Sequence, residues 1–313
     1  SVDMKKLEAL LSRQPHIPAG KRRGVEVVVR TLPAGSKVPI VSLRNAILMG
    51  QKHTTGILDE PYRKVSLEYD GGTWMTNAVQ EIWQMREPLE KVHGRVLVGG
   101  LGLGIFSQLA VGQPGVESVT TIEKSPDIIR LVAAHLDERV RANVVQADLF
   151  EYLKAMKRRE YNSAFFDIWQ GTGEFSWTDY VVPLRRLCRG KIAQSSIYCW
   201  NEDEMIGQLR GPFGALPRVA VMALTDKMPW YYWVFRKAAI NEGVLPRGGL
   251  KPDNSKPFVE LMEAAANAGD DLRIAEFITF YTTKPGTDRW ERVFGRLWDE
   301  ARERHESEVA NAD

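Results

Sequence analysis

The sequence has little cysteine, no long hydrophobic run and almost no excess of one charge. Only two cysteines, Cys188 and Cys199, occur in 313 residues, which is too few for a disulfide framework and lacks the spacing of a metal site. We therefore expect no metal centre and a cytoplasmic location. No apolar run approaches the length of a membrane span and the first residues do not resemble a signal peptide, so we expect no membrane partner.

The formal net charge of +2 favours no particular class of partner. Three short basic runs, residues 21–23, 157–159 and 185–191, could contact the phosphates of a nucleic acid. The second and third of these fall at predicted helix C-termini, where cations complement the helix dipole. A small-molecule substrate is therefore favoured, with nucleic acid as the less favoured alternative.

One apolar strand, residues 95–98, runs directly into glycines at alternate positions, which are Gly100, Gly102 and Gly104. Glu123 follows the next apolar run, residues 119–122. Glycine suits a sharp turn from strand to helix and a close approach of the backbone to a ligand, and a carboxylate can accept both hydroxyls of a ribose. The pattern predicts a nucleoside-binding α/β domain.

The spacing of the glycines argues against a dinucleotide site. The fingerprint G-x-G-x-x-G/A is not completed, because Ile105 and Ser107 stand where the third glycine is required. Three alternating glycines with an acid 19 residues after Gly104 instead resemble the first two motifs of class I S-adenosylmethionine-dependent transferases. The resemblance implies S-adenosylmethionine as the cofactor.

Two further apolar runs also end in an acid. Residues 143–147 lead to Asp148, and residues 163–166 lead to Asp167. The resemblance implies that Asp148, with its neighbour Leu149, binds the adenine and accepts from its exocyclic amine. Asp167, at the tip of the central strand, is the candidate catalytic base or substrate anchor. The alternative is that Asp148 and Asp167 cap helices and that Glu123 is a solvated strand end.

Tryptophans gather near the same predicted edge. Trp169 follows the fourth strand, Trp200 ends the fifth, and Trp177 lies in the glycine-bearing loop between them. We interpret these three as substrate-binding residues on a mobile flap over a flat or cationic substrate. Ordinary packing at the sheet edge is the alternative.

Strands and helices alternate from Arg95 to about residue 238, which requires crossover connections and a mostly parallel sheet. The last two of seven predicted strands, residues 218–225 and 230–236, are joined by a link too short for a helix and should pair antiparallel. We expect an α/β protein of the class I methyltransferase type, with a seven-stranded Rossmann-like sheet, a small β-rich N-terminal region and a helical C-terminal extension. The expected bounds of these three parts are residues 1–90, 91–241 and 242–313.

Shorter patterns complete this organisation. In the N-terminal region, residues 25–29, 38–49 and 64–69 are predicted strands, and residues 76–91 a helix. In the extension, an apolar stripe at helical spacing runs from Trp290 to Trp298. We expect the stripe to dock onto the body or onto a second subunit, so a homodimer is one possible state.

Residues 67–72, the helix after them and the glycine strand resemble the junction between the two domains of spermidine synthases, and the resemblance covers roughly residues 64 to 200. In that family the fourth strand ends in a D-S-S-D pattern whose two acids bind and deprotonate the amine. Asp167 matches the first acid, but Gln170 stands in place of the second, and Leu103 stands where the family has an acid in the glycine loop. We therefore favour methyl transfer to a small-molecule nucleophile, with aminopropyl transfer as the alternative. A nucleic-acid-directed methyltransferase or a non-catalytic cofactor-binding protein comes third.

Overall fold

The structure is a computed structural model that describes residues 2–42, 46, 51–171, 176, 180–205, 300, 303–304 and 306–311. It divides into two compact units. The first comprises Ser1–Thr172 and Pro183–Glu202, and the second comprises Gly173–Val182 and Asp203–Asp313. The strand tips and the glycine loop all belong to the first unit. The division at residues 90 and 241 stays a prediction.

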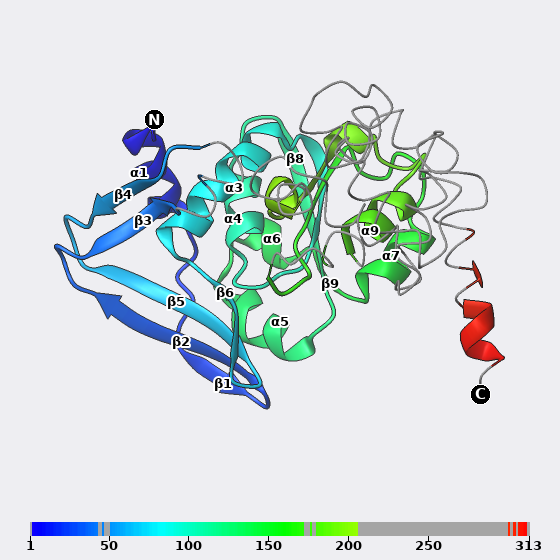
Figure 1. Ribbon diagram of the computed structural model, residues 1–313, viewed down its shortest axis with the longest axis horizontal. Helices are drawn as coiled ribbons and strands as arrows, with labels where there is room; N and C mark the ends of the chain where they lie inside the picture. The colour runs from blue at the N-terminus through cyan, green and yellow to red at the C-terminus, as the bar shows by residue number, and fades with distance from the viewer. Residues whose placement is uncertain are drawn as a thin grey trace, which may run out of the picture. The chain divides into compact units, whose positions relative to one another are not determined.

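The N-terminal region is a β-rich structure with one helix before it (Figure 1). A four-stranded antiparallel sheet has the order β1-β2-β5-β6, with the bounds Gly20–Arg22, Val25–Leu32, Tyr62–Tyr69 and Gly72–Thr76. The first helix and a separate antiparallel pair are α1 (Met4–Arg13), β3 (Lys37–Val41) and β4 (Thr54–Ile57). The strand predicted over residues 38–49 is therefore too long, because β3 ends at Val41.

The turn between β5 and β6 places Asp70 and Gly71 at φ values of 48° and 79°. Helix α3 (Val79–Lys91) follows, close to the predicted bounds, and its buried residues are Val79, Ile82, Trp83, Met85 and Leu89. On the opposite edge strand of the antiparallel sheet, β1, Arg22 Nε lies 3.3 Å from Asp127 Oδ1 of helix α5 (Pro126–Val132). The antiparallel sheet is thus fixed against the α/β part of the same unit.

The α/β part contains a five-stranded parallel sheet in the order β11-β10-β7-β8-β9. Its strands are β7 (Gly94–Gly99), β8 (Val116–Glu123), β9 (Val144–Gln146), β10 (Ser163–Phe166) and β11 (Ile197–Cys199). The helical elements of this part are α4 (Ile105–Val111), α5, η1 (Ala133–His135), α6 (Glu138–Arg141), α7 (Leu149–Ala155), α9 (Val182–Leu187) and η3 (Gln194–Ser196). Every residue of β10 is buried, as expected for a central parallel strand. The rings of Phe106 and Phe165 stack with centroids 3.7 Å apart, which packs α4 onto β10.

In chain order the parallel strands run 3-2-1-4-5 across the sheet, so the direction of winding reverses between β7 and β10. Ligands of open α/β sheets bind in the crevice at such a reversal, beyond the carboxyl ends of the strands. The α/β fold and its parallel sheet are confirmed. The predicted strands over residues 218–225 and 230–236 and the stripe from Trp290 to Trp298 lie outside the described residues.

Within the described residues, no helix is long and apolar enough to cross a membrane. The same part of the chain holds no group of three or more His, Cys, Asp or Glu that could bind a metal ion. Cys188 and Cys199 are both free thiols and both buried.

Candidate functional site

The glycine loop after β7 is built from residues in the left-handed region, with φ of 96° at Gly100 and 52° at Gly102. A Cβ at Gly100 would lie 2.3 Å from the carbonyl oxygen of Asp167, and one at Gly102 would lie 2.2 Å from the sulfur of Met75. Gly100 needs glycine because a backbone oxygen approaches it so closely, whereas Gly102 needs glycine because of its positive φ, since the end of the Met75 side chain can move. The Gly100 amide also donates to Ile122 O at 2.8 Å, which ties the loop to β8.

The third glycine of the motif, Gly104, has φ of 73° and is the N-cap of α4. A Cβ there would lie 2.6 Å from Leu136 Cδ2. This glycine is therefore also required by packing within the chain.

Glu123 is the last residue of β8, and its carboxylate holds the glycine loop in place. Its Oε1 accepts the amide of Leu101 at 3.1 Å, and its Oε2 accepts the amide of Ser125 at 2.9 Å. An ionised carboxylate offers about four lone-pair positions, so these two bonds leave about two unused. The half-buried Glu123 side chain can therefore still accept two ribose hydroxyls.

Asp148 is the N-cap of α7, so it has the helix-capping role that was the alternative to binding adenine. Its Oδ1 accepts the amide of Glu151 at 3.2 Å, and its Oδ2 lies 3.3 Å from Lys124 Nζ. The neighbouring Leu149 side chain is buried, and its Cδ2 lies 2.5 Å from where a Cβ on Gly99 would be. Leu149 thus stands beside the end of β7, Asp148 precedes it in the chain, and the binding of adenine by these two residues stays a prediction.

Asp167 directly follows β10 on the other side of the reversal. Its amide donates to Gly99 O at 2.9 Å, while its carboxylate forms no hydrogen bond within the described part of the chain. Burial, and then the negative charge of Glu81, raise the pKa of Asp167 to about 7. A group with this pKa can give or take a proton at neutral pH, as general acid–base catalysis requires.

Glu81 is a residue of this site that the sequence analysis missed. It lies in the first turn of α3, where its Oε1 accepts Thr76 Oγ1 at 2.8 Å and its Oε2 accepts the Thr76 amide at 3.1 Å. Burial raises its pKa, against the lowering effect of the Thr76 bonds and of Lys64. No sequence pattern distinguishes Glu81, because an acid in the first turn of a helix is common.

Strand β6, at the edge of the antiparallel sheet, also contacts the site. The sulfur of Met75 accepts the Leu103 amide at 3.1 Å. Two residues earlier, Thr73 O accepts Gln170 Nε2 at 3.3 Å, which joins β6 to the segment after β10. Gln170, which occupies the place of the second acid in the spermidine synthase pattern, is therefore engaged by β6.

The tryptophans occupy different environments. Trp169 is buried at 4% exposure, and Trp200 is partly buried against the core, with its amide donating to Phe166 O at 2.9 Å. Trp177 lies outside the described residues. The roles of all three toward a substrate stay predictions.

Two of the basic side chains weighed as phosphate contacts stabilise the protein itself. Arg185 is 2% exposed, bonds to Glu202 Oε2 at 2.7 Å and donates to Ile197 O at 2.8 Å. Lys191 Nζ donates to Leu153 O at 2.6 Å, at the C-terminal end of α7. A cation at the C-terminal end of a helix complements the helix dipole, which is the interpretation given above for the basic run 185–191.

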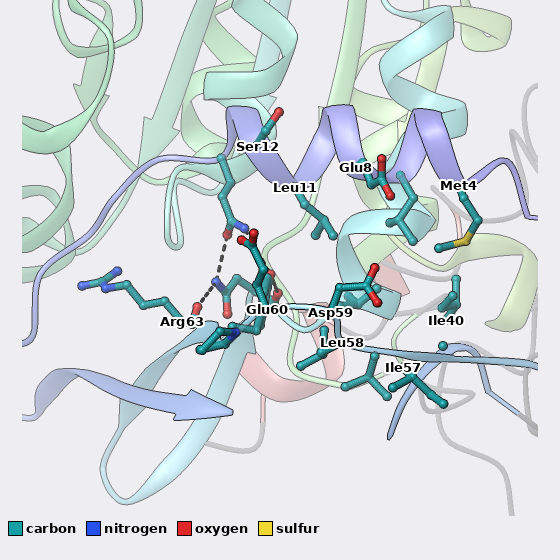
Figure 2. Close-up of a pocket in the computed structure, with 18 of the residues that line it drawn as sticks. Met4, Glu8, Leu11, Ser12, Ile40, Ile57, Leu58, Asp59, Glu60 and Arg63 are labelled. Atoms are coloured by element: carbon teal, nitrogen blue, oxygen red, sulfur yellow. Dashed lines mark hydrogen bonds between the residues drawn. The ribbon is translucent and has the colours of Figure 1, made fainter. Parts of the chain in front are cut away.

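A cavity of about 640 Å³ lies in the N-terminal region, away from the strand tips. Figure 2 shows its lining side chains coming from α1 and from the segment around Ile57 and Asp59. Gln14, Tyr62 and Asn77 form a closed set of hydrogen bonds beside it, and burial raises the pKa of Tyr62 to about 12. Its lining residues include neither the glycine loop nor Glu123, Asp148 or Asp167.

No protein-family model matches the sequence, and no curated protein matches it. Among solved structures, the fold is similar to a SAM-dependent methyltransferase from Archaeoglobus fulgidus, at 23% identity and a TM-score of 0.26, over 34% of this chain and 43% of the other. Spermidine synthase from Thermotoga maritima is similar at 11% identity and a TM-score of 0.30, over 58% and 63%. An SAH-bound methyltransferase from Podospora anserina is similar at 15% identity and a TM-score of 0.30, over 67% and 72%.

The chain therefore spans less than two thirds of the length of the first two of these structures.

Proposed function

We propose that this chain is an S-adenosylmethionine-dependent transferase that moves a methyl group to a small-molecule nucleophile. The observation that carries the proposal is the placement of Glu123. Its carboxylate is fixed to the glycine-loop amide of Leu101 at the tip of β8, and it keeps unused lone pairs. This is the arrangement that binds the diol of a nucleoside in an open α/β sheet.

The residues that would hold the cofactor divide among three strand tips. Glu123 accepts the ribose hydroxyls, Asp148 accepts the adenine amine through Oδ2, and Leu149 lies beside the end of β7. When bound, S-adenosylmethionine supplies an electrophilic methyl group on a sulfonium that is its own leaving group. The chain must then position the nucleophile and, where necessary, take its proton.

Asp167 is the residue that we assign to the proton. Its carboxylate lies at the reversal between β7 and β10, and its raised pKa of about 7 allows it to act as a base at neutral pH. Glu81 raises that pKa further than burial alone would, because a second negative charge disfavours ionisation of Asp167.

Aminopropyl transfer to an amine is the second candidate, and one observation favours it. Gln170 replaces the second acid of the spermidine synthase pattern, but Glu81 brings another carboxylate close to Asp167 from a different element. Two neighbouring carboxylates suit a cationic amine substrate. The choice between the two reactions therefore depends on which form of the cofactor binds.

Calorimetry with S-adenosylmethionine, its decarboxylated form and NAD in parallel tests the proposal. Tighter binding of the intact sulfonium supports methyl transfer, and tighter binding of the decarboxylated form supports aminopropyl transfer. Binding of NAD alone would refute both.

A further inference from the structure

The cavity of about 640 Å³ in the N-terminal region has no part in the proposed transfer reaction. Side chains of α1, β3 and β4 line it, together with residues 58–61 and the start of β5. All of the lining residues belong to the first compact unit, and none is a residue of the candidate site at the strand tips. Sites for small molecules have volumes of about 300 to 1,000 Å³, so the cavity is large enough to hold one.

Apolar side chains form one part of the lining, and two of them are unusually exposed. Ile57 is 71% exposed and Met4 is 49% exposed, although both are large apolar residues. Figure 2 shows Met4 and Leu11 on α1, above Ile40 and Ile57 on the other side of the cavity. Exposed apolar surface with a polar rim marks sites that bind ligands or partners. This part of the lining suits an aliphatic group.

Carboxylates form the second part of the lining. Glu8, Asp59 and Glu60 all line the cavity, and all three residues are exposed. None of the three has an ion pair or a hydrogen bond from its side chain within the described part of the chain. With Arg63 as the cation and His16 neutral, the lining carries three formal negative charges against one positive at pH 7. The charge of the lining therefore favours a cation.

The other polar side chains of the lining are engaged within the protein. Gln14, Tyr62 and Asn77 bond to one another, at 3.1 Å from Gln14 Nε2 to Tyr62 Oη and 2.8 Å from Asn77 Nδ2 to Gln14 Oε1. The Arg63 guanidinium donates to Ile17 O at 2.6 Å, and in Figure 2 it points away from the labelled acids. The carboxylates are therefore the charged groups that a ligand in the cavity would meet.

We propose that the cavity binds an amphipathic cation, namely a small aliphatic amine whose chain lies against the apolar side chains and whose ammonium group meets the carboxylates of Glu8, Asp59 and Glu60. An aliphatic amine is protonated at neutral pH, as the amine of lysine is. One exposed ion pair contributes little, so the selectivity comes from three acids acting together beside an apolar surface. The site is separate from the strand tips, and the inference does not depend on the proposed function.

The first test compares three ligands of equal chain length, octylamine, 1-octanol and octanoate, by calorimetry on the full chain. At low salt, octylamine should bind at least about tenfold more tightly than octanoate, and added salt should reduce the difference because it screens exposed charges. Butylamine should bind more weakly than octylamine, by up to about fourfold for each methylene removed.

The second test uses variants that separate the two parts of the lining. Combined Glu8→Gln, Asp59→Asn and Glu60→Gln should weaken octylamine about tenfold and leave 1-octanol within about a factor of two. Ile57→Thr keeps a β-branched side chain in β4 and should weaken both ligands about threefold. Glu117→Gln, an exposed acid in β8, is the control and should change neither affinity.

Three results would overturn the proposal. They are octanoate binding as tightly as octylamine, octylamine binding the triple variant as tightly as the wild type, and no binding of octylamine to the wild type. In the last case, self-association of the wild type that Ile57→Thr weakens would assign the apolar surface to a second copy of the chain.

Discussion

The tips of β8 and β10 carry acids at equivalent positions, yet the surroundings of the two acids differ. Both oxygens of Glu123 accept backbone amides, from Leu101 and Ser125. The Asp167 carboxylate has no hydrogen bond within the described residues, and its burial, followed by the negative charge of the half-buried Glu81, raises its pKa to about 7. The comparison shows that strand position alone does not decide what an acid does. Their surroundings distinguish an acid held by two backbone amides from one that we propose carries a proton.

The largest expected effect comes from removing the proton carrier. Asp167→Asn should reduce transfer at least about 100-fold, since general base catalysis contributes about 10² to 10⁴. Nucleoside affinity should stay within about a factor of two, because Glu123 is unchanged. Transfer of a labelled group to a panel of small-molecule acceptors measures the rate, and Glu117→Gln, an exposed acid near the start of β8, is the control. Full activity in Asp167→Asn would make Asp167 a binding group only.

Removing the fixed acceptor should weaken binding. Glu123→Ala is expected to cost about 1 to 3 kcal/mol of nucleoside affinity, because the ribose hydroxyls lose their acceptor. Calorimetry measures the loss. Glu117→Ala, at the opposite end of the same strand and exposed, should leave the affinity unchanged. Unchanged affinity in Glu123→Ala would show that the ribose binds elsewhere.

A smaller change should bring the pKa of Asp167 part of the way back toward the value of an isolated acid, because burial, the larger cause, remains. Glu81→Gln removes the negative charge that raises the pKa of Asp167, so the pH at which transfer reaches half its maximum should fall. The dissociation constant of the nucleoside should not change. Glu87→Gln lies on the exposed side of the same helix and serves as the control in pH–rate profiles. An unshifted profile would contradict the role of Glu81.

The last expected effect is on stability rather than on transfer or binding. Because the pKa of Asp167 is raised to about 7, the folded protein keeps a proton between about pH 4 and pH 7 that the unfolded chain loses, so wild-type stability falls across this window. Asp167→Asn should therefore gain stability relative to the wild type as the pH rises from about 4 to about 7, and gain no more above it. Urea unfolding across this range measures the difference.

Asp137 provides the opposite case for the same experiment. Hydrogen bonds from Arg139 lower its pKa to about 2, so its contribution is present above about pH 4 and is lost as the pH falls toward 2. Asp137→Asn should therefore lose stability relative to the wild type at neutral pH. If both variants show the same pH dependence of stability, the opposite pKa shifts of Asp167 and Asp137 are contradicted.

The sequence predicted those parts of the site that depend on local pattern. The glycine loop, Glu123 and Asp167 follow apolar strands, and parallel strands bring their tips to one edge. Met75 and Glu81 were not predictable, because the packing of β6 and of α3 brings them to the site, and Met75 lies 28 positions before Leu103 in the sequence. Asp148 illustrates a different limit, since one position can serve as a helix cap and as a ligand acceptor.

The error in β3 also has a local physical cause. The apolar pattern suggested a strand as far as residue 49, but Pro39 lacks a backbone N–H and a register shift occurs between Pro39 and Val41. Pairing with β4 then ends at Val41. Hydrophobic pattern alone does not report where pairing to a neighbouring strand stops.

The crowding at Gly100 changes what the glycine motif can be used to diagnose. With the carbonyl oxygen of Asp167 only 2.3 Å from a Cβ at this position, selection for a folded protein would keep the glycine in a descendant that had lost its ligand. A substitution at Gly100 would disrupt folding, and any loss of ligand binding would follow from that disruption. In a comparison of distant relatives, an acid at the position of Asp167, whose carboxylate forms no hydrogen bond within the described residues, would therefore be the better marker of a working site.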